Sequence, residues 1–119
     1  MIVKTYKDLI VWQRSMELVK EIYLLTERFS AEERYGLASQ MQRASVAIPS
    51  NIAEGYLRKH KKEYAQFLSI SLGSAAELET QVPICKSLGK FKNLDFSKAE
   101  SLITEVMKML YVLIERIKA

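Results

Sequence analysis

The segment that decides the fold is residues 43–55, RASVAIPSNIAEG. Apolar side chains in and just before it are spaced as on one face of a helix: Leu37, Met41, Ala44, Ile48 and Ile52. A second face, about one residue over, carries Gln40, Arg43, Ala47, Asn51 and Glu54. A surface helix rarely places small and polar residues so regularly beside its buried face. We therefore expect this second face to contact other protein, within the subunit or between subunits.

Apolar spacing along the rest of the chain predicts four helices in all. We expect them over about residues 8–29, over 30–58, from the basic run 58–62 to about 88, and from 97 onward. Ser30 to Glu33 and Ser97 to Glu100 match the capping-box pattern, which marks helix starts. Pro49 cannot donate the helical hydrogen bond to Ser45, so we expect a kink or a break there.

No window alternates as a strand would, and short corners between long amphipathic helices favour antiparallel neighbours. The prediction is an all-α fold: an antiparallel up-down-up-down four-helix bundle, kinked at Pro49, that forms a single domain over residues 1–119. The apolar face of the fourth helix is wider than an intrachain seam requires. Part of that face could therefore contact another subunit.

The composition is typical of a small globular protein, with 49% hydrophobic and 27% charged residues. No stretch reaches the roughly 18 to 20 uncharged apolar residues that cross a bilayer, and the first residues carry no signal-peptide pattern. We therefore expect no membrane partner. Cys85 is the only cysteine, so no intramolecular disulfide can form, and a reducing, cytoplasmic location is expected.

The residues that carry chemistry in enzymes are sparse here. The only histidine, His60, falls on a corner among four cations, so Glu54, Glu77 and Glu79 lack the histidines of a di-metal bundle. No serine has a candidate base, and there is no glycine-rich phosphate loop. Cys85 lies on an apolar face, which indicates a core thiol. We expect no catalytic site, metal, cofactor or small-molecule substrate.

The second face of residues 40–54 has expected partners on the third helix. If the chain folds back near residue 60, positions whose numbers sum to about 120 lie level. Arg43 then meets Glu77 in a partly buried pair that fixes register, Ser45 lies near Ser74, and Gly73 allows a close approach to Ala47. We call the polar members the polar stripe: Gln40, Arg43, Asn51, Glu54, Ser74 and Glu77. The alternative is that Arg43, Asn51 and Glu54 line a ligand site.

The net charge is +4, from 18 Lys+Arg against 14 Asp+Glu, and its placement matters more than its size. In an up-down bundle both termini and the corner near residue 60 share one end. We call it the basic end: Lys4, Lys7, Arg58, Lys59, His60, Lys61, Lys62, Arg116 and Lys118. Such a cluster suits phosphate backbones. The alternative for this end is a solvated rim with no anionic partner. Nearby Tyr56 could stack on a base, and the alternative for it is packing within the protein.

Several segments resemble a known bacterial family, the four-helix-bundle proteins named after intervening sequences in 23S ribosomal RNA genes. They are Asp8-Leu9-x-Val11-Trp12-Gln13, Tyr35-Gly36-Leu37 with Gln40, the segment 43–55, and Gly73-Ser74-x-x-Glu77-Leu78. The resemblance implies a cytoplasmic, non-enzymatic bundle that assembles as a homopentameric ring. The accessory variability proteins of diversity-generating retroelements are similar, and pair a basic pentamer with a reverse transcriptase and nucleic acid. One departure is Gln42, where the family often has an arginine.

Two functional hypotheses follow. In the first, a pentamer binds RNA or another polyanion through Arg58, Lys59, Lys61 and Lys62, supported by Lys4, Lys7 and Lys118, which contact phosphates and do not read bases. In the second, the ring is an assembly or adaptor module for a protein partner and its charge is incidental. A third, a ligand-binding or catalytic bundle, ranks below both.

Overall fold

The structure, a computed structural model, describes residues 2–119, and within that range it consists of helices and connecting segments without strands. The four α-helices are α1 (Ile10–Thr26), α2 (Leu37–Tyr56), α3 (Lys61–Ser87) and α4 (Ser97–Lys118). Three short 3-10 helices accompany them: η1 (Tyr6–Asp8) precedes α1, η2 (Ala31–Glu33) lies between α1 and α2, and η3 (Gly89–Phe91) lies between α3 and α4. None of the described helices combines the length and the apolar run needed to cross a bilayer.

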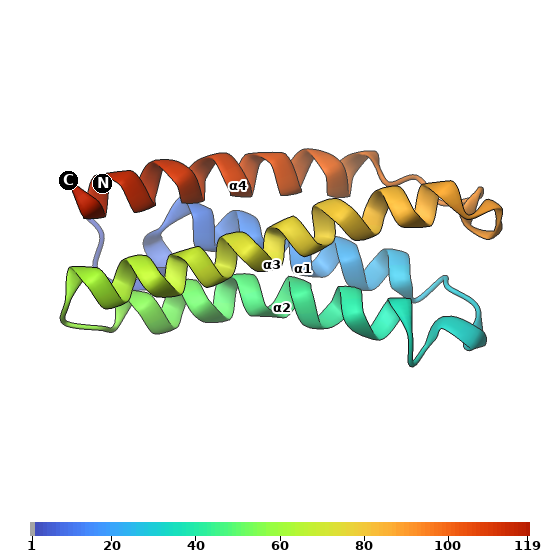
Figure 1. The fold of residues 1–119 in the computed structure, drawn as a ribbon, viewed down its shortest axis with the longest axis horizontal. Coiled ribbons are helices and arrows are strands. Elements are labelled where there is room, and N and C mark those ends of the chain that lie inside the picture. Colours follow the sequence, from blue (N-terminus) through green and yellow to red (C-terminus); the bar gives the residue numbers. More distant parts are fainter. Residues whose placement is uncertain (1) are drawn as a thin grey trace.

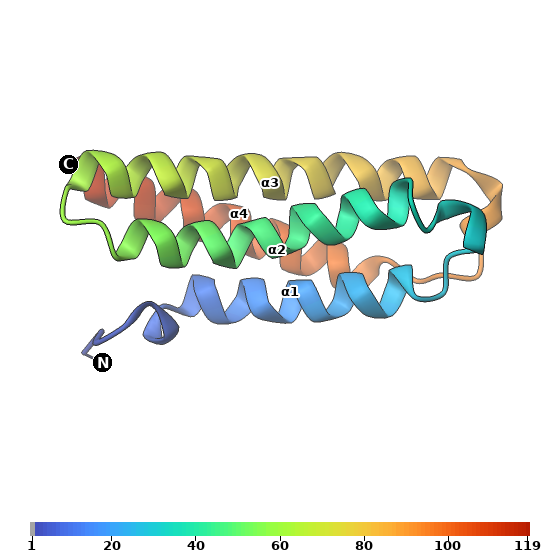
Figure 2. The same cartoon turned by 90° about the horizontal axis from the view of Figure 1, so that it is seen from below.

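The helices run alternately up and down a rod of 45 × 25 × 21 Å (Figures 1 and 2). α1 and α3 each pack against α2 and α4, so that the helices form a square with α1 diagonal to α3. The predicted all-α, antiparallel four-helix bundle is confirmed. This topology follows from the short corners, because a helix that follows a short connection packs antiparallel to the helix before it.

The core is built from the apolar faces that the sequence spacing indicates. On α2, Met41, Ala44, Ile48 and Ile52 are buried, while Leu37 packs at the margin. On α4 the wide apolar face divides into two rows. Ile103, Val106, Leu110 and Ile114 are buried, and Leu102, Met109, Leu113 and Ile117 are half-buried beside them. Full burial of one such side chain contributes about 1.5–3 kcal/mol, so these rows hold the bundle together.

The two prolines lie inside uninterrupted helices. α2 continues through Pro49, and α3 continues through Pro83. A break at Pro49 is therefore excluded, and the kink there stays a prediction. At the same level the Ser71 hydroxyl of α3 donates to the Ile48 carbonyl of α2 at 2.8 Å. This hydrogen bond joins the two helices beside the residue that cannot complete its own helical bonding.

The predicted capping boxes at Ser30 and Ser97 are wrong. Ser30 makes no side-chain cap, because η2 and a turn precede α2 and the Glu33 carboxylate pairs with Lys90 instead. Ser97 is the first residue of α4, and its N–H donates to the Asp95 carboxylate at 2.9 Å. The spacing Ser-x-x-Glu does not distinguish an α-helix start from a 3-10 turn.

A capping box does form near the start of the chain. The Thr5 hydroxyl accepts from the Lys7 N–H at 3.0 Å, and the Asp8 carboxylate accepts from the Thr5 N–H at 3.1 Å. This box caps the start of η1, and α1 begins only at Ile10. The first helix is therefore shorter at both ends than its apolar pattern predicts.

The close approach of α2 and α3 lies at Gly55, not at Gly73. A Cβ built on Gly73 would meet no atom within 4 Å, because that residue faces solvent. A Cβ on Gly55 would lie 2.7 Å from the Phe67 Cβ and 3.2 Å from the Tyr64 carbonyl oxygen. The glycine that lets the backbones meet is thus the last one before the corner, where the chain turns back on itself.

Candidate nucleic-acid interface

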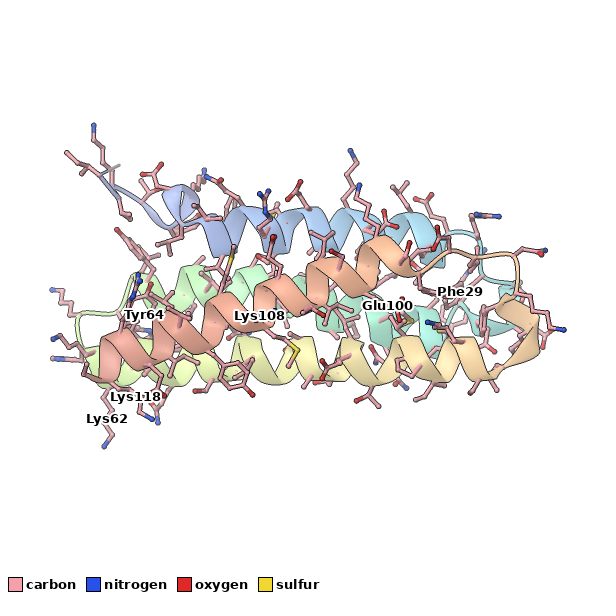
Figure 3. The ribbon with its side chains drawn as sticks, turned by 90° about the horizontal axis from the view of Figure 1, so that it is seen from above. Phe29, Lys62, Tyr64, Glu100, Lys108 and Lys118 are labelled. Atoms are coloured by element: carbon pink, nitrogen blue, oxygen red, sulfur yellow. The ribbon has the colours of Figure 1, made fainter. Side chains whose placement is uncertain are left out.

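Both termini and the α2–α3 corner lie at the same end of the rod (Figure 1). Lys62, in the first turn of α3, and Lys118, at the end of α4, project from that end close to each other (Figure 3). The sequence argument required the cations near residues 4, 59 and 118 to share one end, and the segments that carry them do so. The basic end therefore gathers cations from three parts of the chain at one end of the rod, with the N-terminal segment across that end from Lys62 and Lys118 (Figures 2 and 3).

The lysines of the α2–α3 corner are exposed and make no ion pair within the described chain. Lys59, Lys61 and Lys62 are exposed, and no carboxylate in residues 2–119 forms an ion pair with any of them. Lys61 and Lys62 also begin α3, at the end of a helix that favours anions. Glu63 in the same turn offsets only one charge. These cations therefore do not stabilise their own helix, and they raise the attraction of this end for an external anion.

Arg58 differs from the lysines around it. Its guanidinium forms an ion pair with Glu54, at 3.3 Å, and lies over the Phe67 ring at 4.8 Å from the centroid. Glu54, a predicted member of the polar stripe, is thus paired with a residue of the corner that follows its own helix. Arg58 stays exposed at the basic end but is held in place by these two contacts.

A groove lies directly beside the cations, between the first turns of α3 and the last turn of α4. Its volume is about 810 Å³. It is lined by Lys61, Lys62, Ala65, Gln66, Phe67, Ser69, Ile70, Ile117, Lys118 and Ala119. The sequence analysis did not identify this groove, although the double-width apolar face of the last helix was its signal, since Ile117 belongs to the outer row of that face.

The polar stripe follows α2 and α3, with Gln40, Arg43, Glu54 and Glu77 exposed, Asn51 half-buried and Ser74 buried. Gln40, Arg43, Ser74 and Glu77 line one shallow hollow of about 350 Å³, so the predicted levels bring these four together. The predicted partly buried ion pair between Arg43 and Glu77 is wrong. Arg43 and Glu77 are both exposed, and in the described part of the chain no ion pair joins them. The helices present these residues at their solvent-exposed edges.

Asn51 is the stripe residue that turns back into its own helix. Its side-chain amide donates to the Ala47 carbonyl at 2.8 Å, and the residue is half-buried. Near the corner, the stripe residues Asn51 and Glu54 have partners within the subunit. Around Arg43, in what we call the open half of the stripe, the charged side chains form no ion pair in the described residues. The structure does not bring Arg43, Asn51 and Glu54 together around one cavity.

The aromatic and thiol groups near these sites are packed. Cys85 is fully buried with its Sγ 3.8 Å from the Met41 Sδ, and burial raises the pKa of this thiol to about 11. The predicted core thiol is confirmed. Tyr56 meets Tyr64 edge to face at 6.1 Å between ring centroids, and burial raises the pKa of Tyr64 to about 12. Among residues 2–119, no three His, Cys, Asp or Glu side chains gather as metal ligands would.

These features define a class: a small four-helix bundle with cations from three segments at one end. The model of the 23S rRNA-intervening sequence protein family matches residues 7–112, and the chain belongs to this family. Its fold is similar to that of a solved protein of unknown function from the S23 ribosomal protein family of Bacteroides thetaiotaomicron VPI-5482.

That structural likeness has a TM-score of 0.75 and a sequence identity of 22%, and it covers 89% of this chain and 96% of the other. At this identity it supports the fold alone. The comparison with curated proteins gave no match.

Proposed function

We propose that this chain is a non-enzymatic, cytoplasmic protein that assembles as a homopentamer and binds RNA or another polyanion through its basic end. The observation that carries the proposal is the set of exposed lysines at the α2–α3 corner, Lys59, Lys61 and Lys62, which have no carboxylate partner in the described chain. Lys4, Lys7 and Lys118 extend the same cluster.

The contrast with other lysines supports this proposal. Lys86 and Lys90 are held by Glu100 and Glu33, so their charge is neutralised within the subunit. A cation that keeps only water and salt ions as neighbours can exchange them for phosphates. The release of the condensed counterions then drives binding, and the affinity falls steeply with added salt.

The experiment is an equilibrium titration of a fluorescent RNA between about 50 and 200 mM salt. We expect log affinity to fall linearly with log salt concentration. The triple variant Lys59→Gln, Lys61→Gln, Lys62→Gln should bind more weakly, with a slope lower by about 2, because each lost contact to a single strand removes about 0.7.

The matched control neutralises three exposed lysines away from the basic end, Lys20, Lys98 and Lys108, which take part in no ion pair of the described residues. It changes the net charge equally, so a general charge effect would weaken both triple variants alike. That result, or no RNA binding by the native protein at low salt, would sink the proposal.

Self-association is supported by apolar side chains on the outside of the bundle. Ile10, Leu24, Tyr111 and Val112 are each about half exposed, and their burial between subunits would be favourable. Light scattering at micromolar concentration should give about five times 13.7 kDa. A monomer under these conditions would contradict the ring without touching the RNA proposal.

The second candidate is the adaptor module. It is favoured by a hollow of about 450 Å³ over α1 and α2, where the exposed Tyr23 and Val46 lie beside Gln42 and Arg43. Apolar groups with a polar rim are typical of protein contacts. In this case the native protein should bind no RNA at low salt, and a co-purifying protein should be lost when Tyr23→Ala and Val46→Ser are combined.

A further inference from the structure

We infer that the groove beside Lys61, Lys62 and Lys118 receives an unpaired base of single-stranded RNA, so that the basic end prefers single strands to duplexes. This inference rests on the proposed RNA binding and names the form of RNA that the same site takes.

The groove combines two surfaces that a folded chain normally keeps apart. Its floor is apolar, with Ala65, Phe67, Ile70 and Ile117, and Ile70 is 52% exposed. Its rim carries the ammonium groups of α3 and α4, and Lys62 and Lys118 project there in Figure 3. At about 810 Å³ it exceeds the hollows beside α2, of about 350 and 450 Å³. The occupant must therefore offer an apolar face and negative charge close together.

A nucleotide in a single strand meets both requirements. Its phosphate carries the charge, and its base has two apolar faces within a few bonds of that phosphate. Single-strand binders commonly pair a cationic path for the backbone with side chains on which bases rest. In a duplex the faces of the bases are stacked on one another, so a duplex can reach the lysines but cannot place a base on Ile70 or Ile117.

The extent of the cationic surface favours a chain of repeated charges over a small occupant. Beyond the groove, Lys59 continues the path along the corner, and the segment with Lys4 and Lys7 lies across the same end, opposite Lys62 and Lys118 (Figures 2 and 3). One acidic peptide segment or one anionic amphiphile would use only the rim of the groove. A nucleic-acid strand can hold a base in the groove and continue along the remaining cations.

The first test compares three ligands at about 50 mM salt: a fluorescent single-stranded RNA, the same strand annealed to its complement, and the same strand with abasic sites. We expect the duplex and the abasic strand to bind about tenfold more weakly, which is at the low end of the range for one base stacked on an aromatic side chain, because the floor is mostly aliphatic. Equal affinity for all three would overturn the inference and leave the proposed function standing. No binding to any of them would remove both.

The second test changes the floor without changing the charge. Ile70→Ser should weaken single-strand binding about fivefold and leave duplex binding and the salt slope unchanged. Ile84→Ser is the matched control, because Ile84 lies on the same helix, is 43% exposed and is not among the groove residues. An equal effect of the two substitutions would overturn the inference. So would an acidic leucine-rich peptide that loses binding on Ile70→Ser while RNA binding is unaffected, which would assign the groove to a protein partner.

Discussion

The two ends of this bundle carry lysines in different ways. At the end opposite the basic end, Lys90 pairs with Glu33 and Lys86 pairs with Glu100, at 3.0 Å for the second pair, while the exposed Lys92 and Lys98 take part in no ion pair of the described residues. We call this the ion-paired end. At the basic end, Lys59, Lys61 and Lys62 have no such partner in the structure of residues 2–119. The comparison teaches that net charge alone does not indicate a binding surface. The informative property is whether each cation has a carboxylate partner within the subunit.

The connections at each end explain the difference. The ion-paired end holds two longer connections, α1–α2 and α3–α4, which are tied together by Lys90 with Glu33 and by the rings of Phe29 and Phe91, whose centroids are 4.5 Å apart. The basic end has one short corner, which the close contact at Gly55 already fixes. Its cations are not needed to hold loops and remain available.

The largest expected effect concerns Cys85 and tests whether the ion-paired end stays closed over it. With a pKa of about 11, about one thiol in a thousand is ionised at pH 8, against about one in four for an ordinary thiol. Alkylation of the folded protein at pH 8, followed by mass spectrometry, should be at least about 100-fold slower than that of the unfolded chain. Labelling at the unfolded rate would show that this end opens readily.

The next effect compares a glycine from each end. Gly55→Ala should destabilise the protein by about 1–3 kcal/mol in urea unfolding, because the new methyl meets Phe67 at 2.7 Å. Gly89→Ala is the control at the ion-paired end, where the nearest atom is 3.5 Å away and belongs to the Lys92 side chain. We expect it to change stability by less than about 0.5 kcal/mol. A stabilising Gly55→Ala would mean that the corner is loosely packed.

A smaller effect depends on pH. The hydrogen bond from Lys90 lowers the pKa of Glu33 below its ordinary 4.5, so this pair stabilises the protein above that value and the contribution is lost as pH falls below it. The melting temperature of Glu33→Gln should therefore lie slightly below that of the native protein at neutral pH, and the two should converge under acid conditions.

The same pair also responds to high pH. Glu33 raises the pKa of Lys90 above its ordinary 10.5, so its contribution is complete below that value and is lost as pH rises through the folded pKa. A difference between native protein and Glu33→Gln that is independent of pH on both sides would contradict the assignment of this pair.

The smallest effect belongs to the flank of the rod. Because Arg43 and Glu77 are exposed and unpaired in the described structure, Arg43→Ala and Glu77→Ala should each change the free energy of unfolding of the isolated subunit by less than about 0.5 kcal/mol. If the open half of the stripe contacts a second subunit, the loss appears instead as a lower mass in light scattering. A loss of several kcal/mol in a monomer would instead support the predicted ion pair between Arg43 and Glu77.

Much of the architecture could be predicted from the sequence because it depends on periodicity. The rule that positions summing to about 120 lie level holds for the Ser71 bond to Ile48 and for the hollow shared by Arg43 and Glu77. Periodicity gives the level of a residue along the rod. It does not give the rotation of the helix closely enough to distinguish a buried pair from two exposed neighbours.

Other features depend on local choices that the sequence pattern leaves open. Glu33 can close a helix start or pair with Lys90, and only the packing of η2 against the α3–α4 connection selects the second. Gly55 and Gly73 both lie within helical patterns, but Phe67 lies beneath only the first. The wide apolar face of α4 indicates that Ile117 has apolar neighbours outside the core, but the sequence pattern does not show that the first turns of α3 leave a groove beside it.

A rod 45 Å long and 21 to 25 Å wide that presents several unpaired lysines at one tip has a consequence for assembly. If the subunits of the proposed ring stand parallel, their tips lie about one width apart, which is less than the screening length of about 30 Å at 0.01 M salt and well beyond the 8 Å at physiological salt. Such tips would repel in dilute buffer, and a bound polyanion would relieve that repulsion. By reciprocity, association would then strengthen polyanion binding. Added salt should therefore weaken polyanion binding and favour association of the subunits.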